Sequence, residues 1–264
     1  MEIFGYEFFQ RAILILVLAS IVSGIIGSLV VVKKISMASG SIAHGAFGGL
    51  GIAYYLNISP LLGALGFSLF GALIIGFVHK LSKKFLDSTL SMFWAGGMAV
   101  GLIFIFLTPG YAGDLFSYLF GNILLSRSSD LVLLLPLALI TVLGYAFIKE
   151  TLLATLFNEE FAKLKGVKVN VVFTLFMVLI AFTAVLLIKT MGVVLALAIL
   201  TISPSTALRF AKNVDKMMMI AVILNLFTSI GGLFIAYYLN LLASPVIILV
   251  QIGVFGLSFL FSER

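Results

Sequence analysis

The stretch KETLLATLFNEEFAKLKGVKVN, residues 149–170, is the longest run in this chain that a lipid bilayer would reject. It interrupts a sequence made almost entirely of long apolar segments, so it is predicted to lie in water. Four apolar residues fall on one side of a helix, at spacings of four, four and three, and these are Leu153, Phe157, Phe161 and Leu164. Glu159 and Lys163, four apart, are predicted to share the wet face of that helix.

The second half of this stretch carries the signals of a short helix with defined ends. Asn158 can cap the helix, and Glu159 and Glu160 then fall in its positive first turn. Gly166 is placed to end the helix in the left-handed backbone conformation. We therefore expect a small folded platform at residues 150–168, which is held by one or two short amphipathic helices.

Composition places the chain in a membrane. Apolar residues make up 62% of the sequence and charged residues 10%, with a mean hydropathy of +1.29. Soluble domains have about 25% charged residues, so the fold class is an all-α integral membrane protein. The absence of cysteine excludes disulfides and thiolate metal sites. The net charge of +6 is explained by lysines and arginines in short loops, and no nucleic-acid partner is expected.

A membrane helix needs about 20 apolar residues. Nine segments meet or nearly meet this length, and they predict a polytopic bundle of about 8–9 transmembrane helices in a single transmembrane domain, residues 1–264. They are residues 10–32, 40–56, 60–78, 89–108, 131–148, 170–188, 191–208, 217–239 and 245–261. The segment from Leu115 to Leu125 is too short to cross. In 191–208, Pro204 is expected either to kink the helix or to end a re-entrant one.

The positions of the basic residues predict the orientation. If the N-terminus is outside, all but three of the 16 lysines and arginines lie at inner helix ends or in inner loops. The three exceptions are Arg11, Arg127 and Lys189. The topology is therefore predicted to be N-out and C-in, with an odd number of crossings and with residues 149–170 in the cytoplasm.

His44 is the polar residue most open to a functional interpretation. It lies near the start of the second predicted span, where Gly40, Gly48 and Gly51 fall on the same side of the helix. The imidazole is expected to sit in a groove with little neighbouring bulk. An ionisable residue in a span is a functional candidate, and imidazole suits zinc, manganese or iron. A simple hydrogen bond to a neighbouring helix would look the same in the sequence.

Other polar residues are given structural roles. Asp130 is expected to cap the fifth span beside Arg127, and Lys189 to reach the outer surface. Asn225 and Gln251 are expected to form hydrogen bonds between helices. His79 lies among lysines and is predicted to be solvated, while the many glycines in the spans are interpreted as helix-packing positions.

Several chemistries lack their motifs. There is no phosphate-binding glycine loop followed by Lys and Ser or Thr, so this chain is not expected to hydrolyse nucleotide. No HExxH motif, Ser-His-Asp set or paired intramembrane carboxylates occur, which disfavours an enzyme and an ion-driven pump. A transporter of this composition must take its energy from another protein.

Four stretches together resemble the ABC-type permeases that import zinc, manganese or iron in bacteria and archaea. They are SGSIAHGAFGGLGIAYYL at 39–56, FSYLFGNILLSRSSDL at 116–131, FNEEFAKLKGV at 157–167, and MGVVLALAILTISPSTALRF at 191–210 followed by GGLFIAYYLNLLASP at 231–245. The likeness runs from about residue 11 to 250.

This resemblance implies a homodimer of permeases in the prokaryotic cell membrane, two cytoplasmic ATPases, and an extracytoplasmic metal-binding protein that delivers the cargo. No permanently bound cofactor is implied, because the metal ion is transported. Zinc is the first choice, with manganese and iron as alternatives. The residues that match the family's ATPase-coupling region are Asn158, Glu159, Glu160, Phe161, Ala162 and Gly166.

His44 matches the family histidine that is proposed to touch metal in transit, and Gly40, Ser41 and Gly48 would line the path. Many members carry Asp four residues before this histidine, whereas this chain has Gly40. Three alternatives stay open from the sequence. They are a permease for a metal chelate, siderophore or vitamin, which is usually a longer chain with ten spans, a membrane enzyme acting on lipid, and a secondary transporter.

Overall fold

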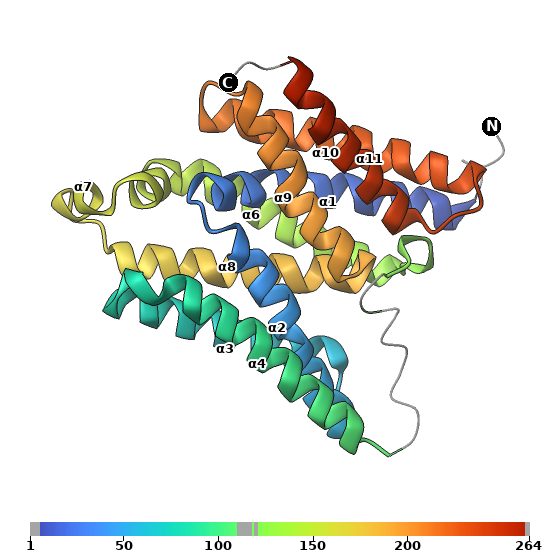
Figure 1. Ribbon diagram of the computed structural model, residues 1–264, viewed down its shortest axis with the longest axis horizontal. Coiled ribbons are helices and arrows are strands. Elements are labelled where there is room, and N and C mark those ends of the chain that lie inside the picture. The colour runs from blue at the N-terminus through green and yellow to red at the C-terminus, as the bar shows by residue number, and fades with distance from the viewer. Residues whose placement is uncertain (1–5, 110–117, 119–120, 262–264) are drawn as a thin grey trace. The chain divides into compact units, whose positions relative to one another are not determined.

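A computed structural model describes residues 6–109, 118 and 121–261 of the protein (Figure 1). All regular structure in these residues is helical. Within the same ranges, nine helices have 18 residues or more, and three short elements connect them. The long helices are α1 (Glu7–Val32), α2 (Ser36–Tyr55), α3 (Pro60–Leu81), α4 (Leu86–Leu107), α6 (Ser128–Phe157), α8 (Val169–Met191), α9 (Val193–Phe210), α10 (Val214–Tyr238) and α11 (Ala243–Phe261). The short ones are η2 (Lys83–Phe85), η3 (Ile123–Leu125) and α7 (Glu159–Leu164).

Each of the nine predicted spans coincides with one of the long helices. Eight helical segments in the described residues are long and apolar enough to cross a membrane, and α2 is not among them. Glycine, serine and His44 take the place of apolar side chains along the 20 residues of α2. The orientation predicted from the basic residues needs an odd number of crossings, so it requires α2 as the ninth.

The chain divides into two compact units. Unit 1 comprises Met1–Lys34, Phe116–Ala146 and Leu186–Arg264. In this unit α1 packs against α9 and α10, and α11 packs against the same two helices. Close approach depends on small residues, because a Cβ at Gly27 would collide with the backbone carbonyl of Leu200. Helix α9 does not end at Pro204 but continues to Phe210.

Unit 2 comprises Ile35–Leu115 and Phe147–Val185. Helix α2 packs closely against α3 and α4, as Figure 1 shows. Glycines line both contacts, since a Cβ at Gly49 would meet the backbone of Gly63 and one at Gly51 would meet the backbone of Gly101. Gly49 and Gly51 are thus packing positions, as the sequence predicts for most glycines in the spans.

The short segment from Leu115 to Leu125 falls largely outside the described residues. Its described end turns at Gly121, which has a φ of +59°, and forms the single turn η3. Asn122 caps this turn, because its Oδ1 accepts a hydrogen bond of 3.1 Å from the backbone N–H of Leu124.

Candidate functional site

The polar stretch 149–170 folds into an elbow made of the end of α6, the short helix α7 and the start of α8. The Oδ1 of Asn158 accepts a hydrogen bond of 3.0 Å from the backbone N–H of Phe161, so the predicted cap of α7 is confirmed. At the other end Gly166 has a φ of +79°. The N–H of Val167 donates to the carbonyl of Ala162 at 3.0 Å, and the N–H of Gly166 donates to that of Lys163 at 2.9 Å. This paired closure is the glycine-dependent helix end that the sequence predicts.

The face that α7 buries is not the one expected from the apolar spacing. Phe157 is 64% exposed, Phe161 49% and Leu164 88%, whereas Ala162 is fully buried and Glu159 is 7% exposed. The assignment of Glu159 to a wet face is therefore wrong. Phe157, Phe161 and Leu164 form an exposed surface instead, and the carboxylate of Glu159 points inward beside the small Ala162.

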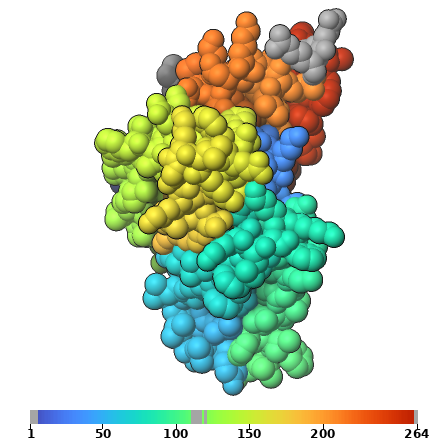
Figure 2. Space-filling model, turned by 90° about the vertical axis from the view of Figure 1, so that its left-hand side faces the viewer, coloured from blue at the N-terminus to red at the C-terminus, as the bar shows by residue number. Residues whose placement is uncertain are grey.

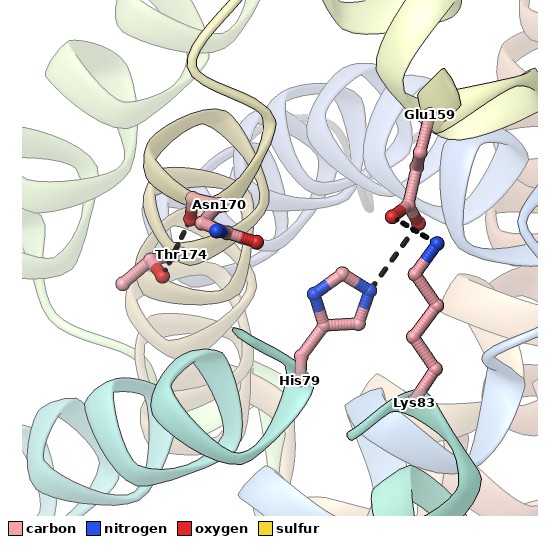
Figure 3. A network of polar contacts seen from close by, with 5 residues as sticks. All are labelled: His79, Lys83, Glu159, Asn170 and Thr174. Atoms are coloured by element: carbon pink, nitrogen blue, oxygen red, sulfur yellow. Dashed lines mark hydrogen bonds and ion pairs between the residues drawn. The ribbon is translucent and has the colours of Figure 1, made fainter. Parts of the chain in front are cut away.

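Glu159 points inward because two side chains from the end of α3 and from η2 meet its carboxylate (Figure 3). The Nζ of Lys83 lies 2.6 Å from Oε2, and the Nε2 of His79 lies 3.2 Å from Oε1. The carboxylate needs both partners, since an unpaired buried charge is unfavourable. The helix that carries Glu159 is thereby tied to residues about 80 positions earlier in the chain.

His79 is buried, at 3% exposed, so the prediction that it is solvated is wrong. Its ring stacks on Phe173 of α8, with the ring centroids 3.7 Å apart and the planes 14° from parallel. One imidazole thus contacts the start of α8 through its face and α7 through its edge. The sequence held a signal for this cluster in the spacing of four between His79 and Lys83, although it gave no indication of the acidic partner.

Helices α3 and α8 meet closely beneath the elbow. A Cβ at Gly76 would collide with Thr174, whose Oγ1 donates a hydrogen bond of 2.8 Å to the backbone carbonyl of Asn170 (Figure 3). The threonine hydroxyl is satisfied within its own helix, so the contact needs only a small residue on α3. Figure 2 shows the elbow, in yellow, adjoining the teal end of α3 on the molecular surface.

The predicted metal contact, His44, is partly buried on α2 and stacks on Trp94 of α4, with ring centroids 4.3 Å apart and planes 6° from parallel. The expectation that little bulk surrounds His44 is wrong, because the indole covers one face of the ring. Ser41 donates a hydrogen bond to the carbonyl of Leu90, and Gly40 is buried. Gly48 lies against Phe67 and the carbonyl of Gly97.

These contacts do not test the predicted role in transport, which stays a prediction for His44, Gly40, Ser41 and Gly48. No group of three or more His, Asp or Glu residues that could hold a metal ion occurs in residues 6–109, 118 and 121–261. A site at His44 alone would bind a metal weakly, which suits a step in transit better than a resident ion.

Unit 1 contains a neutral hydrogen-bond network that joins four helices. The Nδ2 of Asn225 donates to the Oγ of Ser23 at 2.9 Å and to the carbonyl of Ile199 at 3.0 Å. The Nε2 of Gln251 donates to the Oδ1 of Asn225 at 3.1 Å. The predicted interhelical role of both amides is confirmed.

Asp130 and Lys189 form an ion pair at the start of α6. One carboxylate oxygen of Asp130 accepts a hydrogen bond of 2.8 Å from the backbone N–H of Arg127, and the other lies 2.9 Å from the Nζ of Lys189. Asp130 therefore satisfies a backbone group at the helix start from the third helical position, rather than from the cap position that was expected. The side chain of Lys189 is partly exposed, as expected for a lysine that reaches the surface, and it also pairs with the carboxylate of Asp130.

Comparison with known protein families identifies the family of this chain. The ABC 3 transport family matches residues 5–262, which is nearly the whole chain. The chain belongs to the ABC 3 transport family. It is accordingly a multi-pass protein of the cell membrane.

Individual proteins similar to this ABC 3 chain match it along almost its full length. A probable metal transport system membrane protein of Chlamydia trachomatis is 40% identical over 248 residues, which cover 92% of this chain and 85% of that protein. The manganese transport system membrane protein MntC of Listeria monocytogenes is 30% identical over 259 residues, covering 98% and 92%. The structure of PsaBC from Streptococcus pneumoniae in complex with a Fab matches with a TM-score of 0.86 at 27% identity, covering 99% of this chain and 94% of that one.

Proposed function

We propose that this chain is the membrane permease of an ATP-driven importer of divalent metal ions, with manganese as its cargo. Family membership supports transport, and the MntC relative is named for manganese. A second relative is named for metal without further definition. These names favour manganese over zinc, the first choice from the sequence.

The observation that carries the proposal is the exposed apolar surface of the elbow, which is formed by Phe157 at the end of α6 and by Phe161 and Leu164 of α7. Leu164 and Phe157 are among the more exposed large apolar residues of unit 2, and the Nζ of Lys165 lies 4.7 Å from the centroid of the Phe161 ring. A six-residue helix with two defined ends holds this surface in place. A bare apolar surface of this kind marks an interaction site, and a separate cytoplasmic ATPase is the partner that we propose for it.

The contacts of Glu159 supply a route for movement into the membrane helices. When a pair of ATPases closes on nucleotide, α7 moves with them, and the Glu159 carboxylate pulls on Lys83 and His79. His79 in turn presses on Phe173 at the start of α8. A displacement at the elbow would thus reach α3 and α8 through contacts that are already formed.

Cargo handling is proposed for α2. A second permease copy would complete the path, and a metal-binding protein outside would deliver the ion. His44 is the candidate for a transient metal contact, with Gly40, Ser41 and Gly48 along the path. Trp94 covers one face of the imidazole, so an ion would bind at the edge that carries the ring nitrogens.

The test is uptake of radioactive manganese by cells that lack their own manganese importers. The chain is produced with the ATPase and the metal-binding protein encoded beside its gene. We expect manganese accumulation that requires the chain and disappears when the ATPase carries an inactivating substitution in its nucleotide site. Uptake that persists without ATP hydrolysis would refute the importer, and uptake of zinc but not manganese would refute the proposed cargo.

A further inference from the structure

A cavity of about 620 Å³ lies in unit 2, beside the elbow and between α3 and the start of α8. Its floor is the close contact of Gly76 with Thr174, where a Cβ on residue 76 would collide with the threonine side chain. Figure 2 views the molecule from this end. The proposed ATPase contact uses Phe157, Phe161 and Leu164, and none of these residues lines the cavity.

The two helices give the cavity one apolar end and one basic end. On α3, Leu73, Phe77 and Lys80 fall on one face at spacings of four and three, with the lysine in the last turn. On α8, Val171 and Leu175 fall on one face, four apart. These four apolar residues are all more than half exposed. Exposed apolar side chains along a membrane span are in contact with the acyl chains of lipids.

Three lysines gather at the other end of the cavity, and these are Lys80 of α3, Lys163 of α7 and Lys168 before α8. All three are exposed. Among the described residues, the ion pairs at this end use Lys83 and His79, and none of the three lysines has a carboxylate within ion-pair distance. Placement of positive charge at inner helix ends explains why lysines occur here. It does not explain why three of them, from three elements, surround one cavity.

We propose that this cavity binds an anionic phospholipid, with its phosphate among Lys80, Lys163 and Lys168 and its acyl chains along Phe77 and Leu175. Basic cavities at the ends of membrane helices are suited to acidic headgroups. The apolar wall distinguishes a lipid from an acidic surface of the ATPase, because a cytoplasmic protein cannot reach along α3 and α8 into the bilayer. A bound lipid would contact α3, α7 and the start of α8, and two of these elements, α3 and α7, are also joined by the contact of His79 with Glu159. The proposal concerns the membrane around the protein and is independent of the cargo.

Quenching of tryptophan fluorescence by brominated lipid can test the site directly. Trp94 is the only tryptophan of the chain, so Trp94→Phe gives a dark background for the full-length protein in nanodiscs. Phe77→Trp places a reporter on the cavity wall. Phe106→Trp gives a matched reference on α4, because Phe106 is 90% exposed and does not line the cavity. Dibrominated phosphatidylglycerol and dibrominated phosphatidylcholine are compared at both positions.

We expect the Phe77→Trp reporter to favour phosphatidylglycerol over phosphatidylcholine by roughly fivefold in relative binding constant, and the reference to show a ratio near one. Replacement of Lys80, Lys163 and Lys168 by glutamine should bring the first ratio down to that of the reference. The control replaces three exposed lysines outside the cavity by glutamine, namely Lys84, Lys212 and Lys216, and should leave the ratio unchanged.

Equal ratios at the two reporters, or a preference that survives the loss of the cavity lysines, would overturn the proposal. Loss of the preference on addition of about 10 mM inorganic phosphate, but not of chloride at equal ionic strength, would mean that a free anion is the ligand. If the cavity-lysine variant instead fails to copurify with the ATPase and keeps its lipid preference, the lysines serve protein docking, and the lipid site is refuted.

Discussion

The amide network of unit 1 and the ionic contact at the elbow of unit 2 tie helices together with different chemistry. In unit 1 the polar contacts among α1, α9, α10 and α11 join neutral groups, with Asn225 and Gln251 bonded to each other and to neighbouring helices, while the ion pair of Asp130 with Lys189 lies apart from this network at the start of α6. In unit 2, α2 meets α3 and α4 through glycines and through a hydrogen bond from Ser41 to the carbonyl of Leu90, and the contact that ties the elbow to α3 and η2 is ionic. Neutral amides can lie deep in a bilayer at modest cost, whereas a carboxylate is tolerated at a helix end near water. We therefore expect the amide network of unit 1 to stay in place while the ionic contact of unit 2 transmits movement.

The largest effect is expected from Glu159→Ala, which removes the ionic contact at the elbow of unit 2. Loss of the carboxylate leaves Lys83 and His79 without their shared acidic partner, and we expect about 3 kcal/mol of the attachment of α7 to be lost. ATP-coupled uptake should fall by roughly tenfold or more, because each tenfold corresponds to about 1.4 kcal/mol. Hydrogen exchange over residues 158–166 should rise in the purified protein.

The control for Glu159→Ala is Glu160→Ala. Glu160 lies in the same turn but is exposed, so its loss should leave the exchange protection of α7 unchanged. Equal protection in Glu159→Ala and the native protein would show that the ionic contact does not hold the elbow.

The glycine packing of unit 2 can be tested by Gly51→Val. A Cβ at Gly51 would meet the backbone of Gly101, which cannot move away as a flexible side chain could. We expect a destabilisation of about 1–3 kcal/mol, seen as a lower melting temperature in detergent. Gly66→Val is the matched control, because nothing lies within 4 Å of a Cβ at Gly66. Similar melting temperatures for the two variants would contradict close packing at Gly51.

The neutral network of unit 1 should give a smaller effect. Asn225→Leu removes the amide that bonds to Ser23 and Gln251, and such interhelical bonds are worth about 0.6–1.7 kcal/mol in membranes. A double-mutant cycle with Gln251→Leu measures the coupling through unfolding in denaturing detergent. Strict additivity of the two substitutions would refute a shared network.

The smallest effect is expected from Gly166→Ala. Its φ of +79° places alanine in the left-handed region, at a cost of about 1 kcal/mol. The C-terminal end of α7 should fray, which a rise in hydrogen exchange at residues 163–167 would report. Gly144→Ala, where a Cβ meets nothing within 4 Å and φ is not positive, provides the control. An unchanged exchange pattern would show that the closure at Gly166 does not limit the stability of α7.

The features that the sequence predicted correctly depend on residues that are adjacent in the sequence, or on the favourable transfer of apolar side chains from water to lipid. The spans follow from runs of apolar side chains, and the cap at Asn158 and the turn at Gly166 follow from the local backbone. The burial of Glu159 could not be predicted in the same way, because its partners His79 and Lys83 are about 80 residues away. The helical period grouped Phe157 with Phe161 and Leu164 on one helix, but the chain breaks at Asn158, so Phe157 ends α6 and the other two lie on α7. Periodicity also does not say which side of a helix faces the protein.

His44 shows the same limit in a span. The spacing of Gly40, Gly48 and Gly51 suggested an open groove, but Trp94 from α4 fills the space beside the ring. The stacking partner lies 50 positions further along the chain, and nothing in the local pattern points to it. The sequence therefore predicts α2 as a glycine-rich helix, whereas its contacts with other helices are known only from the structure.

The exposed apolar surface of the elbow also affects the fate of the protein before it is assembled. A newly made copy that has not met its partner displays Phe157, Phe161 and Leu164 to the surrounding solution. Chaperones and quality-control proteases recognise such surfaces, so orphan copies should be short-lived. Co-production with the ATPase should then raise the yield of the chain, and the cell would keep the two subunits in proportion by removing the excess.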